Sequence, residues 1–214
     1  MTLKEKHFID IHKGVTGLFM LFLMNLYGTW ENTTSWVYLG LHGTYGLLWI
    51  SKSFLFPDTT WEKETSIWYG LYIWFGLTLY WSSGWIINSG FFNNGVSQMA
   101  PPWLIGLCVS LFGYGVFLHF CSDMYKHTML TQRPGKLIDS GIMKSCRNIN
   151  YFGELVIYLS FAILAMHWIP LLVLVLMMAI VWFPNMIRKD KSLSRYSEFH
   201  KYKKNSKLFI PYIF

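Results

Sequence analysis

Six long apolar runs limit what this chain can fold into, because about 20 apolar residues in a row span a bilayer as a helix. Hydrophobic residues make up 53% of the 214 residues and charged residues only 14%, against about 25% charged in soluble domains. We predict an all-α, polytopic membrane protein with about six transmembrane helices in a single domain, 1–214. The runs are Gly14–Trp30, Trp36–Phe56, Ile67–Ile87, Pro102–Phe120, Phe152–Met166 and Ile169–Ile187.

Short connections and small residues indicate how these helices pack. His167-Trp168-Ile169-Pro170 separates the last two runs, and such a short, Pro-containing link predicts a tight turn and a helical hairpin. Small residues let membrane helices approach closely. They recur at Gly40, Gly43 and Gly46 in the second run, and at Gly106 and Ser110 in the fourth.

The basic residues predict the topology. All 18 Lys and Arg residues fall in four regions, and the three intervening connections contain none. Because cytoplasmic loops carry an excess of Lys and Arg, we predict six spans with both termini cytoplasmic. The net charge of +7 then reflects topology and not a nucleic-acid partner. The regions hold Lys4, Lys6 and Lys13; Lys52 and Lys63; Lys126, Arg133, Lys136, Lys144 and Arg147; and Arg188, Lys189, Lys191, Arg195, Lys201, Lys203, Lys204 and Lys207.

Several protein classes lack support in the sequence. The first thirteen residues are polar and carry no cleavage site, so we expect no cleavable signal. Three cysteines are too few for a disulfide framework, and neither a Rossmann glycine pattern nor a P-loop is present. Asn32-Thr33-Thr34 matches the consensus sequence for N-glycosylation, but its loop is so short that we expect Asn32 not to be glycosylated.

The segment Arg147–Glu154, Arg-Asn-Ile-Asn-Tyr-Phe-Gly-Glu, concentrates polar chemistry where a basic stretch meets an apolar run. One interpretation is a helix start, with Asn150 as N-cap and Glu154 near the positive end of the helix dipole. That interpretation leaves Arg147, Asn148 and Tyr151 unexplained. A charge at the edge of hydrocarbon is costly without a partner or ligand, so we favour a binding pocket, in which Gly153 lets another group approach the backbone.

Polar residues at the end of the fourth run add to this pocket. His119, Asp123 and His127 are four residues apart and share a helix face. We predict no metal, since no further Cys or His group has a recognisable ligand spacing. We interpret the face as a polar wall that opens to the cytoplasmic side. Arg133-Pro134-Gly135-Lys136 is a turn with two cations suited to phosphate or carboxylate groups.

Together these segments resemble the C-terminal domain of the steroid 5-alpha-reductase family. The resembling stretches are His119–Asp123, Arg133-Pro134-Gly135, Leu137–Gly141, Asn150–Glu154, Tyr202 and the ending Ile210-Pro211-Tyr212-Ile213-Phe214. They cover about the last hundred residues. A variant of the same core is similar to the isoprenylcysteine carboxyl methyltransferases and sterol C14 reductases, although Asn148-Ile149 replaces their His-Pro pair.

The resemblance implies an NADPH site among the last helices and the cytoplasmic loops. By position, the residues implied to contact the cofactor are His119, Asp123, Arg133, Asn150, Tyr151, Glu154, Arg188 and Tyr196. Cations suit its phosphates, while amides and carboxylates suit the nicotinamide, ribose and adenine groups.

The N-terminal half departs from the family pattern. Steroid reductases hold the enone with a Glu and a Tyr from their earlier helices. The end of the second run and the residue after it, Trp49–Pro57, contain no Glu at the comparable place. We therefore predict a reductase-like cofactor half, 102–214, and N-terminal helices, 1–101, of open role. His42, Tyr45 and Tyr69 are candidate proton donors, although we favour an ordinary helix-packing role for each.

We predict NADPH-dependent reduction of an activated carbon–carbon double bond in a lipid or sterol-like substrate. One alternative is a methyltransferase using S-adenosylmethionine; another is a structural subunit of a larger membrane complex without activity. Membrane lipids and the lipid substrate are the expected partners. We expect the endoplasmic reticulum in a eukaryote, or else a mitochondrial or bacterial inner membrane.

Overall fold

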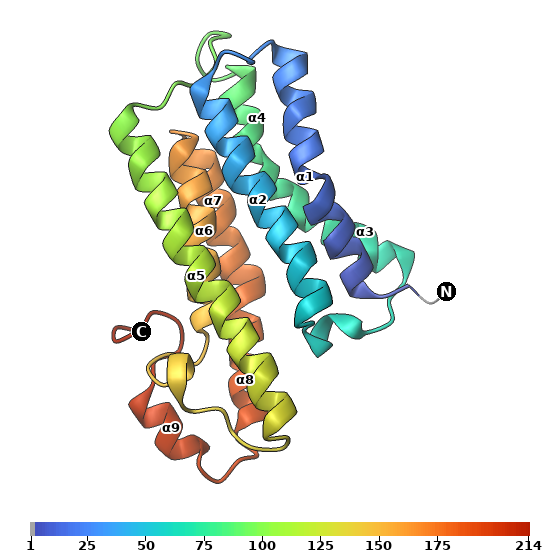
Figure 1. The fold of residues 1–214 in the computed structure, drawn as a ribbon, viewed down its shortest axis with the longest axis vertical. Helices are drawn as coiled ribbons and strands as arrows, with labels where there is room; N and C mark the ends of the chain where they lie inside the picture. Colours follow the sequence, from blue (N-terminus) through green and yellow to red (C-terminus); the bar gives the residue numbers. More distant parts are fainter. Residues whose placement is uncertain (1–2) are drawn as a thin grey trace. The chain divides into compact units, whose positions relative to one another are not determined.

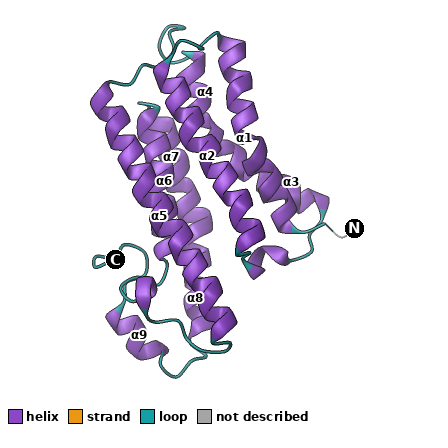
Figure 2. Ribbon diagram, viewed as in Figure 1, coloured by secondary structure: helices purple, strands orange, loops and turns teal. Residues whose placement is uncertain are grey.

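The computed structural model describes residues 3–214, which form helices joined by loops (Figures 1 and 2). Those residues contain two isolated β-bridges and no strand, so the all-α prediction is confirmed. The helices are α1 (Glu5–Tyr27), α2 (Thr33–Leu55), α3 (Ile67–Thr78), α4 (Ser82–Ser89), α5 (Pro102–Gln132), α6 (Ile149–Leu164), α7 (Trp168–Met177), α8 (Phe183–Leu193) and α9 (Phe199–Asn205).

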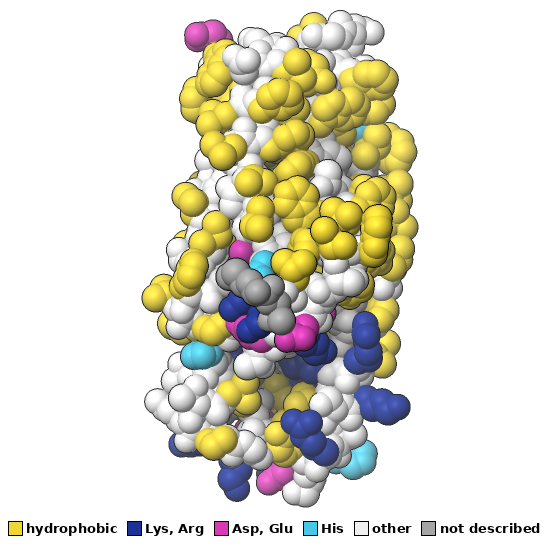
Figure 3. All heavy atoms as spheres, turned by 90° about the vertical axis from the view of Figure 1, so that its right-hand side faces the viewer, with side chains coloured by type: hydrophobic (Ala, Val, Ile, Leu, Met, Phe, Trp, Pro, Cys, Tyr) yellow, Lys and Arg dark blue, Asp and Glu magenta, His cyan; other side chains and the backbone are white. Residues whose placement is uncertain are grey.

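Apolar surface identifies an integral membrane protein. Among the described residues, three helical stretches are long and apolar enough to cross a bilayer: Glu5–Tyr27, Pro102–Gln132 and Trp168–Leu193. Leu18, Phe22 and Leu26 lie one helical turn apart along α1 and are 68%, 55% and 57% exposed. A stripe of this kind would meet lipid tails. Many hydrophobic side chains lie at the surface on the face drawn in Figure 3. The count of six spans and the hairpin remain predictions.

Four predicted runs differ from the helices observed, the fourth run because α5 continues past Phe120 to Gln132. α1 begins at Glu5, well before Gly14, and carries Lys13 within it. The third run is broken by a 3-10 turn, Leu79–Trp81, and the sixth by a π-helical turn, Met178–Trp182. The predicted turn between the last two runs is shorter than expected, because α7 already begins at Trp168.

Local chemistry explains why α7 begins so early. The Nδ1 atom of His167 accepts a hydrogen bond from the backbone N–H of Ile169 at 3.2 Å. This bond satisfies one of the amide groups that a helix start leaves open. Pro170 then falls in the first turn, where its missing N–H costs little.

Residue contacts divide the chain into two compact units. Unit 1 is Met1–Phe112 with Tyr158–Leu174, and unit 2 is Gly113–Ile157 with Val175–Phe214. The functional division between 1–101 and 102–214 remains a prediction.

In unit 1, glycines set the packing of α1 against α2. A Cβ atom added at Gly43 would lie 3.7 Å from the Cα of Gly17, and one added at Gly46 would lie 2.2 Å from the carbonyl oxygen of Lys13. Close packing is therefore confirmed for Gly43 and Gly46. It is wrong for Gly40, where an added Cβ meets nothing within 4 Å.

In unit 2, α5 and α6 approach each other through a second pair of glycines. A Cβ atom added at Gly153 would lie 2.5 Å from the backbone nitrogen of His119, and one added at Gly115 would lie 2.8 Å from the carbonyl oxygen of Gly153. The close approach predicted at Gly153 is thus made by α5. In the part of α5 that belongs to unit 1, the packing role predicted for Gly106 and Ser110 is wrong, because an added Cβ at Gly106 meets nothing within 4 Å. Ser110 is exposed and bonds only its own helix, at the Gly106 carbonyl.

Candidate cofactor site

Arg147 fastens the C-terminal tail of unit 2 to the start of α6. Its Nε and Nη2 atoms donate to the two carboxylate oxygens of Asp190 at 2.9 and 3.0 Å. Its Nη1 atom donates to the carbonyl oxygen of Ser206 at 2.7 Å and to the Ser206 hydroxyl at 3.1 Å. Arg147 is only 5% exposed. Its burial is explained by these partners and requires no ligand.

Tyr202 and Phe209 complete this junction. The Tyr202 hydroxyl donates to the carbonyl oxygen of Met143 at 2.7 Å, and burial raises the pKa of this tyrosine, so it serves as a neutral donor. Phe209 is buried, and its carbonyl oxygen accepts from the Cys146 thiol at 3.2 Å. The tail is therefore buried at Phe209, whereas Tyr212, Ile213 and Phe214 are exposed.

Asn148, and not Asn150, occupies the N-cap position of α6, which begins at Ile149. The carbonyl oxygen of Asn148 already accepts the N–H of Phe152 at 3.1 Å, which corrects the interpretation of Asn150 as the cap. The Asn148 side chain is fully buried. Its Nδ2 atom donates to the Leu208 carbonyl at 2.8 Å, and its Oδ1 atom accepts from Lys189 at 3.0 Å.

His119, Asp123 and Asn150 form the polar contact between α5 and α6. The Nδ1–H of His119 donates to the carbonyl oxygen of Asn150 at 3.0 Å. The other ring nitrogen, Nε2, lies 3.9 Å from Oδ2 of Asp123, and both side chains are at least 95% buried. The Oδ1 atom of Asn150 is buried and has no hydrogen-bond partner among residues 3–214. A buried acceptor of this kind is costly unless a ligand supplies a donor.

Cations surround this contact. The Nζ atom of Lys189 donates to the carbonyl oxygen of Arg147 at 2.7 Å, and its charge interacts with those of Asp123 and Lys126. We did not predict Lys189 as a site residue. Arg188, Lys189 and Asp190 are three consecutive charged residues. Which of them faces α6 depends on the rotation of α8 about its axis, and the sequence does not reveal that rotation.

The other predicted site residues are spread over unit 2. Arg133 is exposed where α5 ends. Arg188 is exposed and donates to Oδ1 of Asn185 at 2.6 Å. Tyr196 packs under the guanidinium of Arg195, 4.9 Å from ring centre to Cζ.

The two remaining predicted residues lie on α6. The ring of Tyr151 is 5.9 Å from that of Trp182, and Glu154 is half-buried. The structure therefore brings His119, Asp123 and Asn150 into one cluster and leaves the ligand contacts of the other five residues as predictions.

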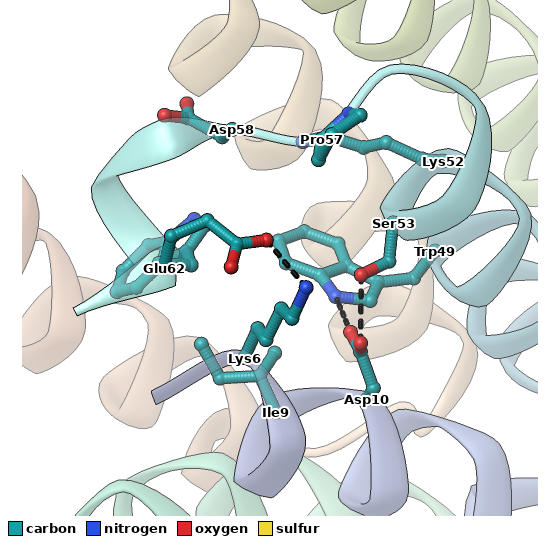
Figure 4. Close-up of a pocket in the computed structure, with 10 residues that line it drawn as sticks. Lys6, Ile9, Asp10, Trp49, Lys52, Ser53, Pro57, Asp58 and Glu62 are labelled. Atoms are coloured by element: carbon teal, nitrogen blue, oxygen red, sulfur yellow. Dashed lines mark hydrogen bonds and ion pairs between the residues drawn. The ribbon is translucent and has the colours of Figure 1, made fainter. Parts of the chain in front are cut away.

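Unit 1 contains a separate small cavity, at the N-terminal end of α1 (Figure 4). Glu62 in its wall is held by Lys6 and, at 2.8 Å, by Lys4. Asp10 accepts from the Trp49 indole at 3.1 Å and from the Ser53 hydroxyl at 2.7 Å. The cavity wall thus ties α1 to α2 and to the turn Thr59–Glu62.

Two neighbouring lysines make the Glu62 carboxylate a stronger acid than usual. Hydrogen bonds from Lys4 and Lys6 lower the pKa of Glu62 from an ordinary value of 4.5 to about 2. Glu62 is therefore ionised throughout the neutral and mildly acidic range.

The fold and these contacts define a helical integral membrane protein with a buried polar cluster, formed by His119, Asp123 and Asn150 of unit 2. The family model described as 3-oxo-5-alpha-steroid 4-dehydrogenase matches residues 68–214. This is more than half of the chain, and the chain belongs to that family, a group of steroid-reductase-like membrane enzymes. No individual curated protein matches the sequence.

The family match confirms the resemblance inferred from the sequence and reaches further toward the N-terminus. It begins at Trp68, so it includes α3 and α4 as well as the last hundred residues. Residues 3–67, with α1 and α2, lie outside it.

Proposed function

We propose that this protein is an NADPH-dependent reductase of an activated carbon–carbon double bond in a membrane lipid. The observation that carries the proposal is the buried Oδ1 atom of Asn150, which has no hydrogen-bond partner among the described residues. It lies beside the contact of His119 with Asn150, inside the motif that the family shares. An amide N–H of a nicotinamide would satisfy that oxygen.

The charges of unit 2 suit the rest of such a cofactor. Lys126 and Lys189 are cations near Asp123, and ammonium groups bind phosphates as point charges. In the proposal Arg133, Arg188 and Tyr196 extend this surface toward the phosphates and adenine, and Tyr151 and Glu154 extend it along α6. The bound cofactor supplies a hydride, while the protein orients it and keeps water out.

Membership of the reductase family favours this function over methyl transfer. The substrate in the proposal is a lipid that reaches the enzyme from the bilayer, and the endoplasmic reticulum is the proposed location in a eukaryotic cell. Both statements depend on the cofactor being NADPH, which makes cofactor binding the decisive measurement.

The test is thermal unfolding of the detergent-solubilised protein with NADPH, NADH or S-adenosylmethionine. A ligand that binds only the folded state raises Tm, and NADPH is expected to do so. A rise with S-adenosylmethionine alone would instead indicate a methyltransferase. No rise with any of them would favour a structural subunit.

A variant pair ties the binding to the site. Asn150→Ala removes an acceptor that makes no hydrogen bond among the described residues, so the stability of the ligand-free protein should change little. Loss of one buried hydrogen bond to the cofactor should cost about 1–3 kcal/mol, which is roughly a 5- to 150-fold weaker NADPH affinity. Asn205→Ala, at the exposed end of α9, is the matched control and should bind as wild type does.

A further inference from the structure

The cavity of unit 1 lies at the ends of two apolar helices, beside the first residues of α1 and the last residues of α2 (Figure 4). Lipid headgroups border a bilayer at such helix ends. Phe54 and Leu55 follow the cavity residue Ser53 along α2, and both are exposed. Ile11 follows the cavity residue Asp10 along α1 and is also exposed. Charged groups beside exposed apolar side chains suit a ligand with a charged head and acyl chains.

Charges of both signs line this cavity. The wall carries three carboxylates and two ammonium groups, from Asp10, Asp58, Glu62, Lys6 and Lys52. Lys4 adds a third ammonium through its hydrogen bond to Glu62 at 2.8 Å, so these charges balance. A balanced wall favours a zwitterionic ligand over a simple anion or cation, because a buried charge needs a partner of opposite sign.

Two of the carboxylates can accept hydrogen bonds from an ammonium group. Figure 4 shows Glu62 and Asp10 entering the cavity wall from different segments of the chain. The oxygens of Asp10 accept one hydrogen bond each, from the Trp49 indole and the Ser53 hydroxyl, and those of Glu62 accept one each from two lysines. A carboxylate can accept about four, so both retain capacity for the N–H donors of a primary ammonium.

The enclosed space of the cavity limits the size of that group. It measures about 20 Å³, and one water molecule needs roughly 10–15 Å³. A primary ammonium is about as large as a water molecule, whereas a trimethylammonium group is much larger. Lys52, which is buried in the wall, supplies a cation for a phosphate attached to the ammonium through a short carbon chain.

We propose that this cavity binds the headgroup of phosphatidylethanolamine from the surrounding membrane. The ammonium lies between Asp10 and Glu62, the phosphate faces Lys52, and the acyl chains lie along Phe54 and Leu55. The bound lipid ties α1 to the end of α2. The site belongs to unit 1 alone, so this inference does not depend on the proposed reductase function.

The first experiment measures lipid binding to the full-length wild-type protein by native mass spectrometry from detergent micelles. The lipids share their acyl chains and differ only in the head: phosphatidylethanolamine, its N-methyl and N,N-dimethyl forms, and phosphatidylcholine. Affinity should fall with each methyl group. Phosphatidylcholine should bind roughly 10- to 150-fold more weakly, because its head has no N–H to donate to a carboxylate. Equal affinities along this series would overturn the proposal.

Two further ligands test the charge and the source of the head. Phosphatidylglycerol has the phosphate without the ammonium and should bind no better than phosphatidylcholine. Tighter binding of phosphatidylglycerol than of phosphatidylethanolamine would show a simple anion site and overturn the proposal. Glycerophosphoethanolamine, the same head without acyl chains, should not displace the lipid at equal concentration. Displacement under that condition would show a site for the soluble compound and not for a membrane lipid.

Variants assign the two ends of the headgroup to their residues. Asp10→Asn removes a charge at constant size and should abolish the preference for phosphatidylethanolamine over phosphatidylcholine. Lys52→Met keeps a long side chain on the Trp49 ring, which lies 4.5 Å from Nζ of Lys52, and should weaken both lipids about equally. Lys63→Met is the matched control, because Lys63 is exposed outside the cavity wall, and should bind as wild type does. A full preference for phosphatidylethanolamine in Asp10→Asn would overturn the assignment, and the wild-type headgroup series decides the proposal if that variant does not fold.

Discussion

Buried cations in this protein are stabilised in two different ways. Arg147 forms a two-pronged ion pair with Asp190 and also bonds the carbonyl oxygen of Ser206. Lys13 is surrounded by the rings of Tyr45, Trp49 and Tyr158. The first arrangement pairs the cation with a carboxylate, whereas the second places it against aromatic rings and a tyrosine hydroxyl.

Removing Arg147 should severely destabilise unit 2. Arg147→Ala leaves the Asp190 carboxylate without its bidentate partner, and breaking a buried pair typically costs about 3–5 kcal/mol. Thermal unfolding measures the loss. Arg195→Ala is the control, because Arg195 is exposed and exposed substitutions usually stay within about 0.5 kcal/mol.

The double variant Arg147→Met with Asp190→Leu sharpens this prediction, since replacing a buried pair by apolar side chains is often tolerated. It should be more stable than Arg147→Ala. Equal losses in Arg147→Ala and Arg195→Ala would show that the ion pair does not hold the tail.

Acid should weaken the contact of Glu62 with Lys4 and Lys6. The two lysines lower the pKa of Glu62 from 4.5 to about 2 in the folded protein. The stabilisation of the folded protein by this ion pair is therefore complete above pH 4.5 and is lost as the pH falls through about 2. We expect wild type to have a higher Tm than Glu62→Gln at neutral pH, and this difference to shrink between pH 4.5 and 2.

Salt should reduce the same difference, because the pair is partly exposed and screened. Glu31→Gln, in the turn between α1 and α2, is a control for the general effect of acid. A difference in Tm that stays constant down to pH 2 would mean that Glu62 contributes through packing and not through its charge.

Glycines at helix contacts determine how the helix pairs fit together. Gly46 meets the backbone of Lys13, and Gly153 meets the backbone of His119. Each contact brings a chemically important side chain beside the neighbouring helix. The segment Asn150–Glu154 thus contains a packing residue, Gly153, among its polar ones.

Two glycines of α2 should respond oppositely to alanine. Gly46→Ala places a Cβ 2.2 Å from the Lys13 carbonyl oxygen, and overpacking of this kind typically costs about 1–3 kcal/mol. Gly40→Ala meets nothing within 4 Å and should stabilise the helix by roughly 0.5–1 kcal/mol. Thermal unfolding compares the two variants, and a similar effect of both would contradict the contact at Gly46.

The sequence was informative where chemistry is local. The motif around Asn150 and the spacing of His119 and Asp123 predicted a polar site, and the structure brings these three residues together. The sequence was misleading for Lys13, which we grouped with the charges before the first span. Its true position depends on Tyr158, which lies 145 residues away along the chain, and no local pattern reveals such a partner.

The helix boundaries also depend on partners that are distant in the sequence, so the sequence did not predict them. Hydropathy predicted the apolar stretches, but α1 extends back through His12 and Lys13 because partners within unit 1 satisfy them. His12 bonds the Thr78 hydroxyl at 3.2 Å. The 3-10 turn at Leu79–Trp81 follows directly after Thr78, and nothing in the apolar run Ile67–Ile87 marks that break.

The whole molecule exposes apolar side chains on its candidate spanning helices, as an integral membrane protein requires. Within residues 3–214, three stretches meet the length and hydropathy needed to cross a bilayer, while α2, α3 and α6 do not meet both. The six-span prediction therefore depends on helices that are shorter or more polar than usual.

Single cysteines at positions 94, 140 and 194, in a variant whose three natural cysteines are alanine, distinguish six spans from three. With six spans, positions 140 and 194 should label from one side and position 94 from the other. With only the three longest stretches spanning, positions 140 and 194 would label from opposite sides. Labelling of intact and of permeabilised vesicles by a membrane-impermeant reagent provides the measurement.

The contact of Arg147 with Ser206 also has a consequence for synthesis of the chain. The two residues are 59 positions apart, and at roughly 5–20 residues per second a ribosome needs about 3–12 s to make that interval. During this delay α5 and the newly made α6 can already meet at Gly115 and Gly153, but the guanidinium still lacks its final acceptors. Unit 2 is thus completed only when the segment that follows α9 has been translated.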